Sequence, residues 1–147
     1  MKIVLASDHG GFNYKEAIKK HLVDIGHEVV DVGAFSTDSC HYPLTAIAAG
    51  EKVARGEAEL GFLVCTSGEG ISIAANKVKG VRAAIGYDDK VAEMARRHND
   101  ANMLAFGENY MKLDDVLRRT DIFLNTPFEG GRHATRVDII KDYEQKQ

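Results

Sequence analysis

Residues 60–77 read LGFLVCTSGEGISIAANK, and this stretch decides the fold more than any other. A short apolar run ends at Cys65, a polar glycine-containing turn follows, and a helix of small residues from Ile71 to Asn76 comes next. This order of strand, tight loop and helix places a thiol beside free backbone N–H groups and the positive end of a helix dipole. Such a site favours the thiolate and suits chemistry on a small anionic molecule.

The alternation of strand and helix continues along the rest of the chain. Apolar runs predict strands at Ile3–Ala6, Glu28–Val32, Leu60–Cys65, Val81–Gly86 and Asn102–Phe106. Helical spacing predicts helices over about 14–25, 44–55, 71–77, 91–98 and 113–124, with Gly26 as a stop and a last helix starting near Gly131. Strands that alternate with helices pair in parallel through right-handed crossovers. The expected fold is therefore an α/β three-layer sandwich.

Polar residues follow several of the predicted strands. Asp8 and His9 follow the first strand, Cys65–Gly70 lie at the end of the third, and Tyr87 and Asp88 follow the fourth. Parallel sheets bind ligands outside the carboxyl ends of their strands, near the point where the strand order reverses. We therefore expect these residues to gather at one edge of the sheet.

Length and composition point to one ordinary globular domain over residues 1–147. The chain is 44% hydrophobic and 28% charged, and its net charge of −3 gives no reason to expect a nucleic-acid partner. Its longest apolar runs are about five residues, far below the ~20 that cross a bilayer, and we expect no membrane partner. The N-terminus lacks the pattern of a signal peptide. Cys40 and Cys65 make neither a disulfide framework nor a zinc site, so we expect a reducing cytoplasm.

Cys65 has two interpretations. A cysteine at the end of a buried strand is often only a small hydrophobic residue. The loop behind it favours a functional thiol, because Gly68 and Gly70 let the backbone approach a ligand and Thr66 and Ser67 add hydroxyl groups.

Two other thiol or glycine motifs fit poorly. A thiol phosphatase needs an arginine six residues after the cysteine, and Ile71 stands there. A dinucleotide site needs G-x-G-x-x-G after the first strand, but the turn there is Asp8-His9-Gly10-Gly11. Both alternatives are weakened.

A basic cluster opens the last predicted helix. Arg132 and Arg136 are four residues apart and share a helix face, with His133 beside them. Like charges at this spacing repel, and cations in a first turn oppose the helix dipole, each by a few tenths of a kcal/mol. A solvated basic patch is one interpretation. A bound phosphate, which arginine matches with paired donors, explains the pattern better.

Three further residues are candidates for proton transfer. His98 ends a helix, where a cation also suits the dipole, and it is a natural proton carrier near neutral pH. Asp8 and His9 form either an acid/base pair or a simple turn and helix cap. No His, Asp or Glu pair has a convincing metal-ligand spacing, so the sequence predicts no metal.

Five segments together closely resemble the ribose-5-phosphate isomerase B family, which also includes the galactose-6-phosphate isomerase subunits. They are SDHGG (7–11), YP (42–43), VCTSGEGISIAANK (64–77), RRHNDANMLAFG (96–107) and EGGRHATR (129–136). The resemblance runs essentially the full length of the chain. It implies a five-stranded parallel sheet of Rossmann type and a homo-oligomer, dimer or tetramer, with active sites shared between subunits. It also implies a cofactor-free interconversion of a phosphorylated aldose and ketose through an enediolate, with ribose 5-phosphate and ribulose 5-phosphate as the first choice.

The resemblance also implies residue roles. Cys65 is expected to be the general base, and Ser67 to stabilise the enediolate together with the backbone amides of 66–70, which include Thr66, Gly68 and Gly70. Asp8 and His98 are expected to assist ring opening, with His98 coming from the partner subunit. The expected sugar-hydroxyl contacts are Tyr42 and Asn99, and the expected phosphate contacts are His9, Arg132, His133 and Arg136.

The chain departs from the family pattern at three places. Thr66 and Ser67 replace the common Gly-Thr pair, Ile71 occupies the position of an alternative glutamate base, and Asn109 stands where many members have a basic residue. These departures leave open a hexose 6-phosphate substrate of the allose or galactose type. A non-catalytic sugar-phosphate-binding subunit is a second alternative.

Overall fold

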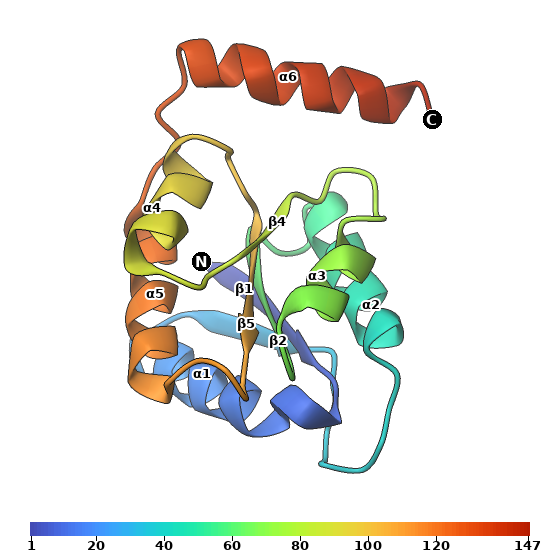
Figure 1. Cartoon of the computed structure of the whole chain (residues 1–147), viewed down its shortest axis with the longest axis vertical. Coiled ribbons are helices and arrows are strands. Elements are labelled where there is room, and N and C mark those ends of the chain that lie inside the picture. Colours follow the sequence, from blue (N-terminus) through green and yellow to red (C-terminus); the bar gives the residue numbers. More distant parts are fainter.

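A computed structural model describes all residues of the chain, 1–147, and shows a parallel sheet surrounded by helices (Figure 1). The strands are β1 (Lys2–Ser7), β2 (Glu28–Asp31), β3 (Leu60–Cys65), β4 (Ala83–Ile85) and β5 (Met103–Gly107). The helices are the short 3-10 helix η1 (His9–Gly11), then α1 (Phe12–Asp24), α2 (Tyr42–Ala54), α3 (Glu69–Ala75), α4 (Asp89–Arg97), α5 (Leu113–Asn125) and α6 (Arg132–Gln145). None of these helices combines the length and apolar character needed to cross a membrane.

All five strands are parallel, and their order in the sheet is β2-β1-β3-β5-β4. The strand order reverses between β1 and β3, because the chain first moves outward to β2 and then returns to the other side of β1. The loops that follow β1 and β3 therefore flank the usual ligand position of such a sheet. The predicted α/β class and the five-stranded parallel sheet are confirmed.

Helices cover both faces of the sheet. Alternate strand residues point to opposite faces, as the pleat requires. Ile3 and Leu5 pack with α1, α4 and α5, whereas Val4 and Ala6 pack with α2 and α3. Figure 1 shows these two groups of helices on opposite sides of the strands. The predicted three-layer sandwich is confirmed.

Two predicted boundaries differ from the structure for local reasons. Helix α3 begins at Glu69 rather than Ile71, because Gly68 adopts a left-handed conformation (φ 86°) and caps it. Strand β4 is shorter than the predicted Val81–Gly86, because the Val81 N–H bonds the carbonyl of Val78 in a turn. The predicted stop at Gly26 is confirmed, since α1 ends at Asp24 and Gly26 has φ 94°.

Helix α6 lies apart from the sandwich, across the top of the view in Figure 1. Only His133 and Val137 of this helix are buried. Its far end is held by hydrogen bonds from Lys79 Nζ to the carbonyl of Gln147 and from the Gly80 N–H to the Glu144 carboxylate. Its exposed apolar side chains are Ile139, Ile140 and Tyr143. The helix thus carries an apolar surface that nothing in the same chain covers.

Candidate active site

The loop after β1 places Asp8 and His9 at the carboxyl edge of the sheet. The Asp8 side chain is buried and accepts the Gly11 N–H at 3.1 Å, so it caps η1. The Cys40 N–H donates to Nδ1 of His9 at 3.2 Å, which leaves the exposed Nε2 side of the ring open. One carboxylate oxygen of Asp8 is therefore used in capping η1, and His9 keeps one ring nitrogen available for a ligand.

Cys65 ends β3, and its side chain faces α2 and α3. It is only 5% exposed in the isolated chain, and its Sγ accepts a hydrogen bond from the Gly68 N–H at 3.1 Å. The N–H groups of Glu108 and Asn109 bond the carbonyls of Cys65 and Thr66 at 2.9 and 3.1 Å. The hydrogen bonds from Glu108 and Asn109 thus hold the loop in place, and the Gly68 amide dipole is directed at the sulfur.

Close packing joins this loop to its neighbours. A Cβ at Gly10 would overlap Oγ1 of Thr66, so the loops after β1 and β3 lie in direct contact. A Cβ at Gly70 would stand 2.9 Å from the Tyr42 ring, so the tyrosine lies against the start of α3. The structure therefore brings Tyr42 at the start of α2 to the same edge as the Cys65 loop. We call Asp8, His9, Tyr42 and residues 65–70 the carboxyl-edge group.

A cavity of about 790 Å³ borders this loop on the side of β4 and β5, and its lining includes Ser67, Tyr87 and Arg119. Its size is in the range that holds small molecules. Cys65 does not line it, because the sulfur lies on the other side of the loop in the isolated chain. Tyr87 and Ser67 both line it, as the position of both residues after strands predicts.

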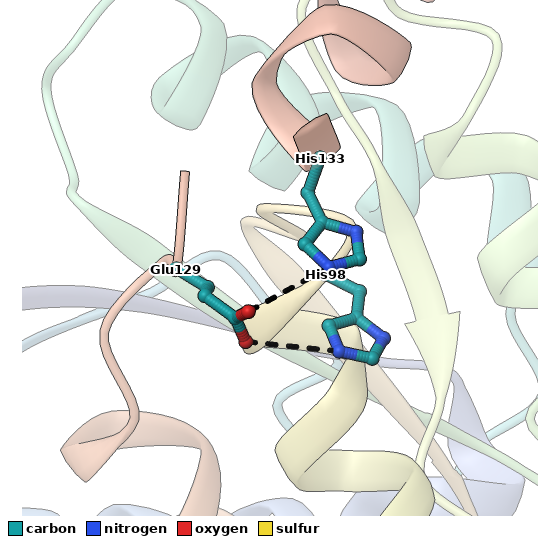
Figure 2. A group of neighbouring side chains, drawn as sticks. All are labelled: His98, Glu129 and His133. Carbon is teal, nitrogen blue, oxygen red and sulfur yellow. Dashed lines mark ion pairs between the residues drawn. The ribbon is translucent and has the colours of Figure 1, made fainter. Parts of the chain in front are cut away.

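A second cluster forms where α4 ends and α6 begins. The rings of His98 and His133 stack with centroids 4.1 Å apart and an interplanar angle of 10°. Glu129 places one carboxylate oxygen 3.8 Å from Nε2 of His98 and the other 3.8 Å from Nε2 of His133 (Figure 2). Side chains from the end of α4 and from residues 129–133 thus converge on one point.

His133 is the buried member of this cluster, with 5% exposure. Burial and the nearby charge of His98 hold the pKa of His133 below its usual value, and the arginines at 132 and 136 act in the same direction. The negative charge of Glu129 opposes these effects without cancelling them. The shift favours the neutral imidazole, and its Nε2 has no hydrogen-bond partner in the chain.

Arg132 and Arg136 are the only arginines without a carboxylate partner. Every other arginine forms an ion pair with an Asp or Glu: Arg55, Arg82, Arg96, Arg97, Arg118 and Arg119. Both unpaired side chains are exposed at the start of α6. They are thus free to bind an anion. Asn99 directly follows His98 in the sequence. Its side-chain amide makes no hydrogen bond within the chain, and its backbone carbonyl accepts a hydrogen bond from Arg82.

The second cluster lies at the other end of the strands, near their amino termini. Helix α4 runs back from the carboxyl end of β4, so His98 comes shortly before Met103, the first residue of β5. Gly61 pairs with Met103 and Cys65 with Gly107, and this four-residue rise spans about 13 Å. We call His98, Asn99, Arg132, His133 and Arg136 the amino-edge group. One chain does not bring the two groups together.

Two residues at these sites were not singled out from the sequence. Glu108 receives the Tyr14 N–H at 2.8 Å and bonds the Cys65 carbonyl through its own N–H, so it links α1 to the loop. Glu129 joins the two histidines. Its spacing of four residues before His133 was the available signal, but the residues between them include two glycines that precede the helix.

Comparison with known proteins now identifies the family. The profile described as Ribose/Galactose Isomerase matches residues 3–140. Ribose-5-phosphate isomerase B of Escherichia coli is 42% identical, over 99% of this chain and 98% of that protein. The structure of Clostridium thermocellum ribose-5-phosphate isomerase B is 47% identical with a TM-score of 0.98, over 99% of both chains.

A further solved structure, ribose-5-phosphate isomerase B of Mycoplasma genitalium, contains bound ribulose-5-phosphate. It is 38% identical to this chain with a TM-score of 0.95, and the match covers 99% of this chain and 97% of that one. The profile match and these full-length likenesses agree with the five sequence segments quoted above. The chain therefore belongs to the ribose/galactose isomerase family of enzymes.

Proposed function

We propose that this protein interconverts ribose 5-phosphate and ribulose 5-phosphate without a cofactor, by proton transfer through an enediolate. The observation that carries the proposal is the sulfur of Cys65, which accepts an amide hydrogen bond beside the point where the strand order reverses. The relative with bound ribulose-5-phosphate supports the choice of substrate.

The proposed chemistry takes place at the carboxyl-edge group. Cys65 removes the proton from the carbon next to the sugar carbonyl, and the Gly68 N–H donates a hydrogen bond to its sulfur. Negative charge then develops on the substrate oxygen. The Ser67 hydroxyl and the N–H groups of residues 66–70 stabilise this charge, as preorganised donors do in related enzymes. Asp8 and His98 assist ring opening.

The far end of the substrate carries the phosphate. Arg132 and Arg136 have no carboxylate partner, and two parallel N–H donors of a guanidinium match phosphate oxygens. His9 adds a ring nitrogen from the other edge of the sheet. Binding of the phosphate at this distance from the reaction holds the reacting carbon next to Cys65 in the correct orientation.

This arrangement needs a second copy of the chain. The carboxyl-edge and amino-edge groups lie at opposite ends of the strands in one chain. A complete site therefore requires His98 and Arg136 from a partner subunit. The uncovered apolar side chains of α6 at Ile139, Ile140 and Tyr143 supply a surface for such a contact. We infer a homo-oligomer with shared sites, working in the cytoplasm, where both free cysteines stay reduced.

Purified protein should isomerise ribose 5-phosphate and exchange one substrate hydrogen with solvent. The measurement is product formation in deuterated water, with allose 6-phosphate and galactose 6-phosphate tested in parallel. Preferred turnover of a hexose 6-phosphate would move the proposal to that substrate. Binding of ribose 5-phosphate without hydrogen exchange would reject catalysis and leave a binding subunit, and release of inorganic phosphate would indicate a phosphatase.

Mixing two inactive variants should restore activity. In a dimer of one Cys65→Ala chain and one His98→Ala chain, one site carries both defects and the other carries none. Random exchange makes half of the dimers mixed, so we expect about a quarter of the wild-type activity. The assay is the isomerisation rate after the two proteins are unfolded and refolded together.

The matched control is a mixture of Cys65→Ala with Ser67→Ala, because both residues belong to the carboxyl-edge group. In a mixed dimer of these two variants, one site contains the Cys65→Ala defect and the other contains the Ser67→Ala defect. No site is intact, so activity should stay low. If the Cys65→Ala and His98→Ala mixture also stays inactive while mixed dimers form, the shared site is disproved.

A further inference from the structure

The cluster of His98, Glu129 and His133 has the composition of a metal site. The end of α4 supplies one imidazole, residues 129–133 supply a carboxylate and a second imidazole, and the ligand atoms are all within 4.8 Å of one another. The separations of 3.8 Å between Glu129 and each histidine exceed hydrogen-bond length. The three side chains therefore converge without satisfying one another (Figure 2).

The buried histidine gives an independent indication of a ligand. Nε2 of His133 is enclosed, has no hydrogen-bond partner, and is the atom that points toward the Glu129 carboxylate. Buried ring nitrogens normally have a partner. A ligand held between His133, His98 and Glu129 would supply the missing interaction.

We propose that His98, Glu129 and His133 bind a divalent transition-metal ion of the zinc type. Two histidines and a glutamate, with a fourth position open to water, form a known zinc ligand set. Calcium and magnesium prefer oxygen ligands, whereas imidazole suits zinc, copper, nickel and cobalt. Nitrogen and oxygen donors around zinc stand about 3.3 Å apart in tetrahedral geometry, so the three donors must move closer together.

The movement that this requires is local. The lone pair of an imidazole nitrogen lies in the ring plane, so two stacked rings must splay before they share one ion. The His98 side chain is 39% exposed and the Glu129 side chain 49%, so both are free to rotate while His133 stays in place. Arg132 and Arg136 carry positive charge on the same helix end, and we expect them to keep the affinity modest.

Occupation of the site would remove His98 from the role proposed for it in ring opening. Zinc should therefore inhibit the isomerase reversibly, and a chelator should restore activity. This consequence rests on the proposed function. The binding itself does not, so the two are tested by separate measurements.

The decisive experiment is titration of the full-length protein with cobalt(II), followed by the visible absorption of the bound ion. We expect saturation at one ion per subunit and displacement of cobalt by zinc. The variant Glu129→Gln should raise the dissociation constant at least about tenfold, because one charged ligand is lost. Glu129 is exposed, so this variant should fold normally, and zinc should inhibit its remaining isomerase activity more weakly than it inhibits the wild type.

Three controls separate this site from others. The variants Cys65→Ser and Cys40→Ser should bind cobalt as the wild type does, because no thiolate takes part. The variant His21→Asn removes a histidine that pairs with Asp121 elsewhere and should also leave binding unchanged. Wild-type affinity in Glu129→Gln, or loss of the spectrum in Cys65→Ser, would overturn the proposal. Cobalt binding remains decisive even if no isomerase activity is found.

Discussion

Replacing Cys65 with alanine should lower kcat for ribose 5-phosphate by about 10³-fold, within the range that a general base contributes. The reason is that Ile71 occupies the position of the alternative glutamate, which leaves Cys65 as the only evident base. KM should change little, because Cys65 makes none of the proposed phosphate contacts. The measurement is steady-state kinetics on the purified variant, with circular dichroism and thermal unfolding as checks of the fold.

The matched control is Cys40→Ala, which removes the other free thiol. Cys40 lies beside His9 and makes only backbone contacts with its ring, so kcat should stay within a few-fold of the wild type. A Cys65→Ala enzyme that keeps near-normal turnover would reject the cysteine as the base. An unfolded variant would be replaced by Cys65→Ser, which keeps the acceptor for the Gly68 N–H.

Replacing Lys15 with methionine should lower the free energy of unfolding by about 3–5 kcal/mol, the usual loss when one partner of a buried ion pair is removed. Nζ of Lys15 lies 2.6 Å from the Asp31 carboxylate, and the lysine side chain is only 1% exposed. The same ammonium group lies over the rings of Phe12 and Phe35, at 5.3 and 5.6 Å. Thermal and denaturant unfolding measure the loss, and Tm should fall by roughly 10 °C.

Lys19→Met is the matched control, because Lys19 pairs with the same Asp31 oxygen at 3.2 Å but is 41% exposed. An exposed partner contributes little, so this variant should lose less than about 1 kcal/mol. Equal losses in the two variants would show that burial of Lys15 is not the cause.

The same ion pair sets an acid limit on stability. Burial raises the pKa of Asp31, but hydrogen bonds from Lys15, the Gly33 N–H and Lys19 outweigh it, so the folded pKa lies below the ordinary value. The unfolded carboxyl takes up its proton near pH 3.9, before the folded one does. The contribution to stability is therefore complete above that pH and is lost as the pH falls through the folded pKa. In Lys15→Met this acid loss should be smaller.

The sequence predicted the sheet well because its strands are uniformly apolar and end at polar turns. Leu60–Cys65 is such a strand and matches β3 at both ends, and the other four predicted strands are present with shifted ends. The errors arise where a single residue controls the local backbone. The left-handed Gly68 starts α3 early, and the turn at Val78–Val81 shortens β4.

In the candidate site too, some residues could be predicted from the sequence and others could not. The carboxyl-edge group was predictable, because residues that follow parallel strands meet at one edge. The stacking of His98 on His133 was not, because it depends on where α6 packs against the end of α4. Glu129 was missed for that reason. The catalytic roles, the shared site and the oligomeric state stay predictions.

The separation of the two residue groups across one sheet also bears on how such proteins diverge. If each active site is formed by two polypeptides, a mutation in the carboxyl-edge group encoded by one gene copy can be compensated by the intact group that another copy encodes. After duplication, the copies are then free to specialise, one retaining the thiol and the other the guanidinium anchor. A mixed assembly of two such copies would still hold one complete centre.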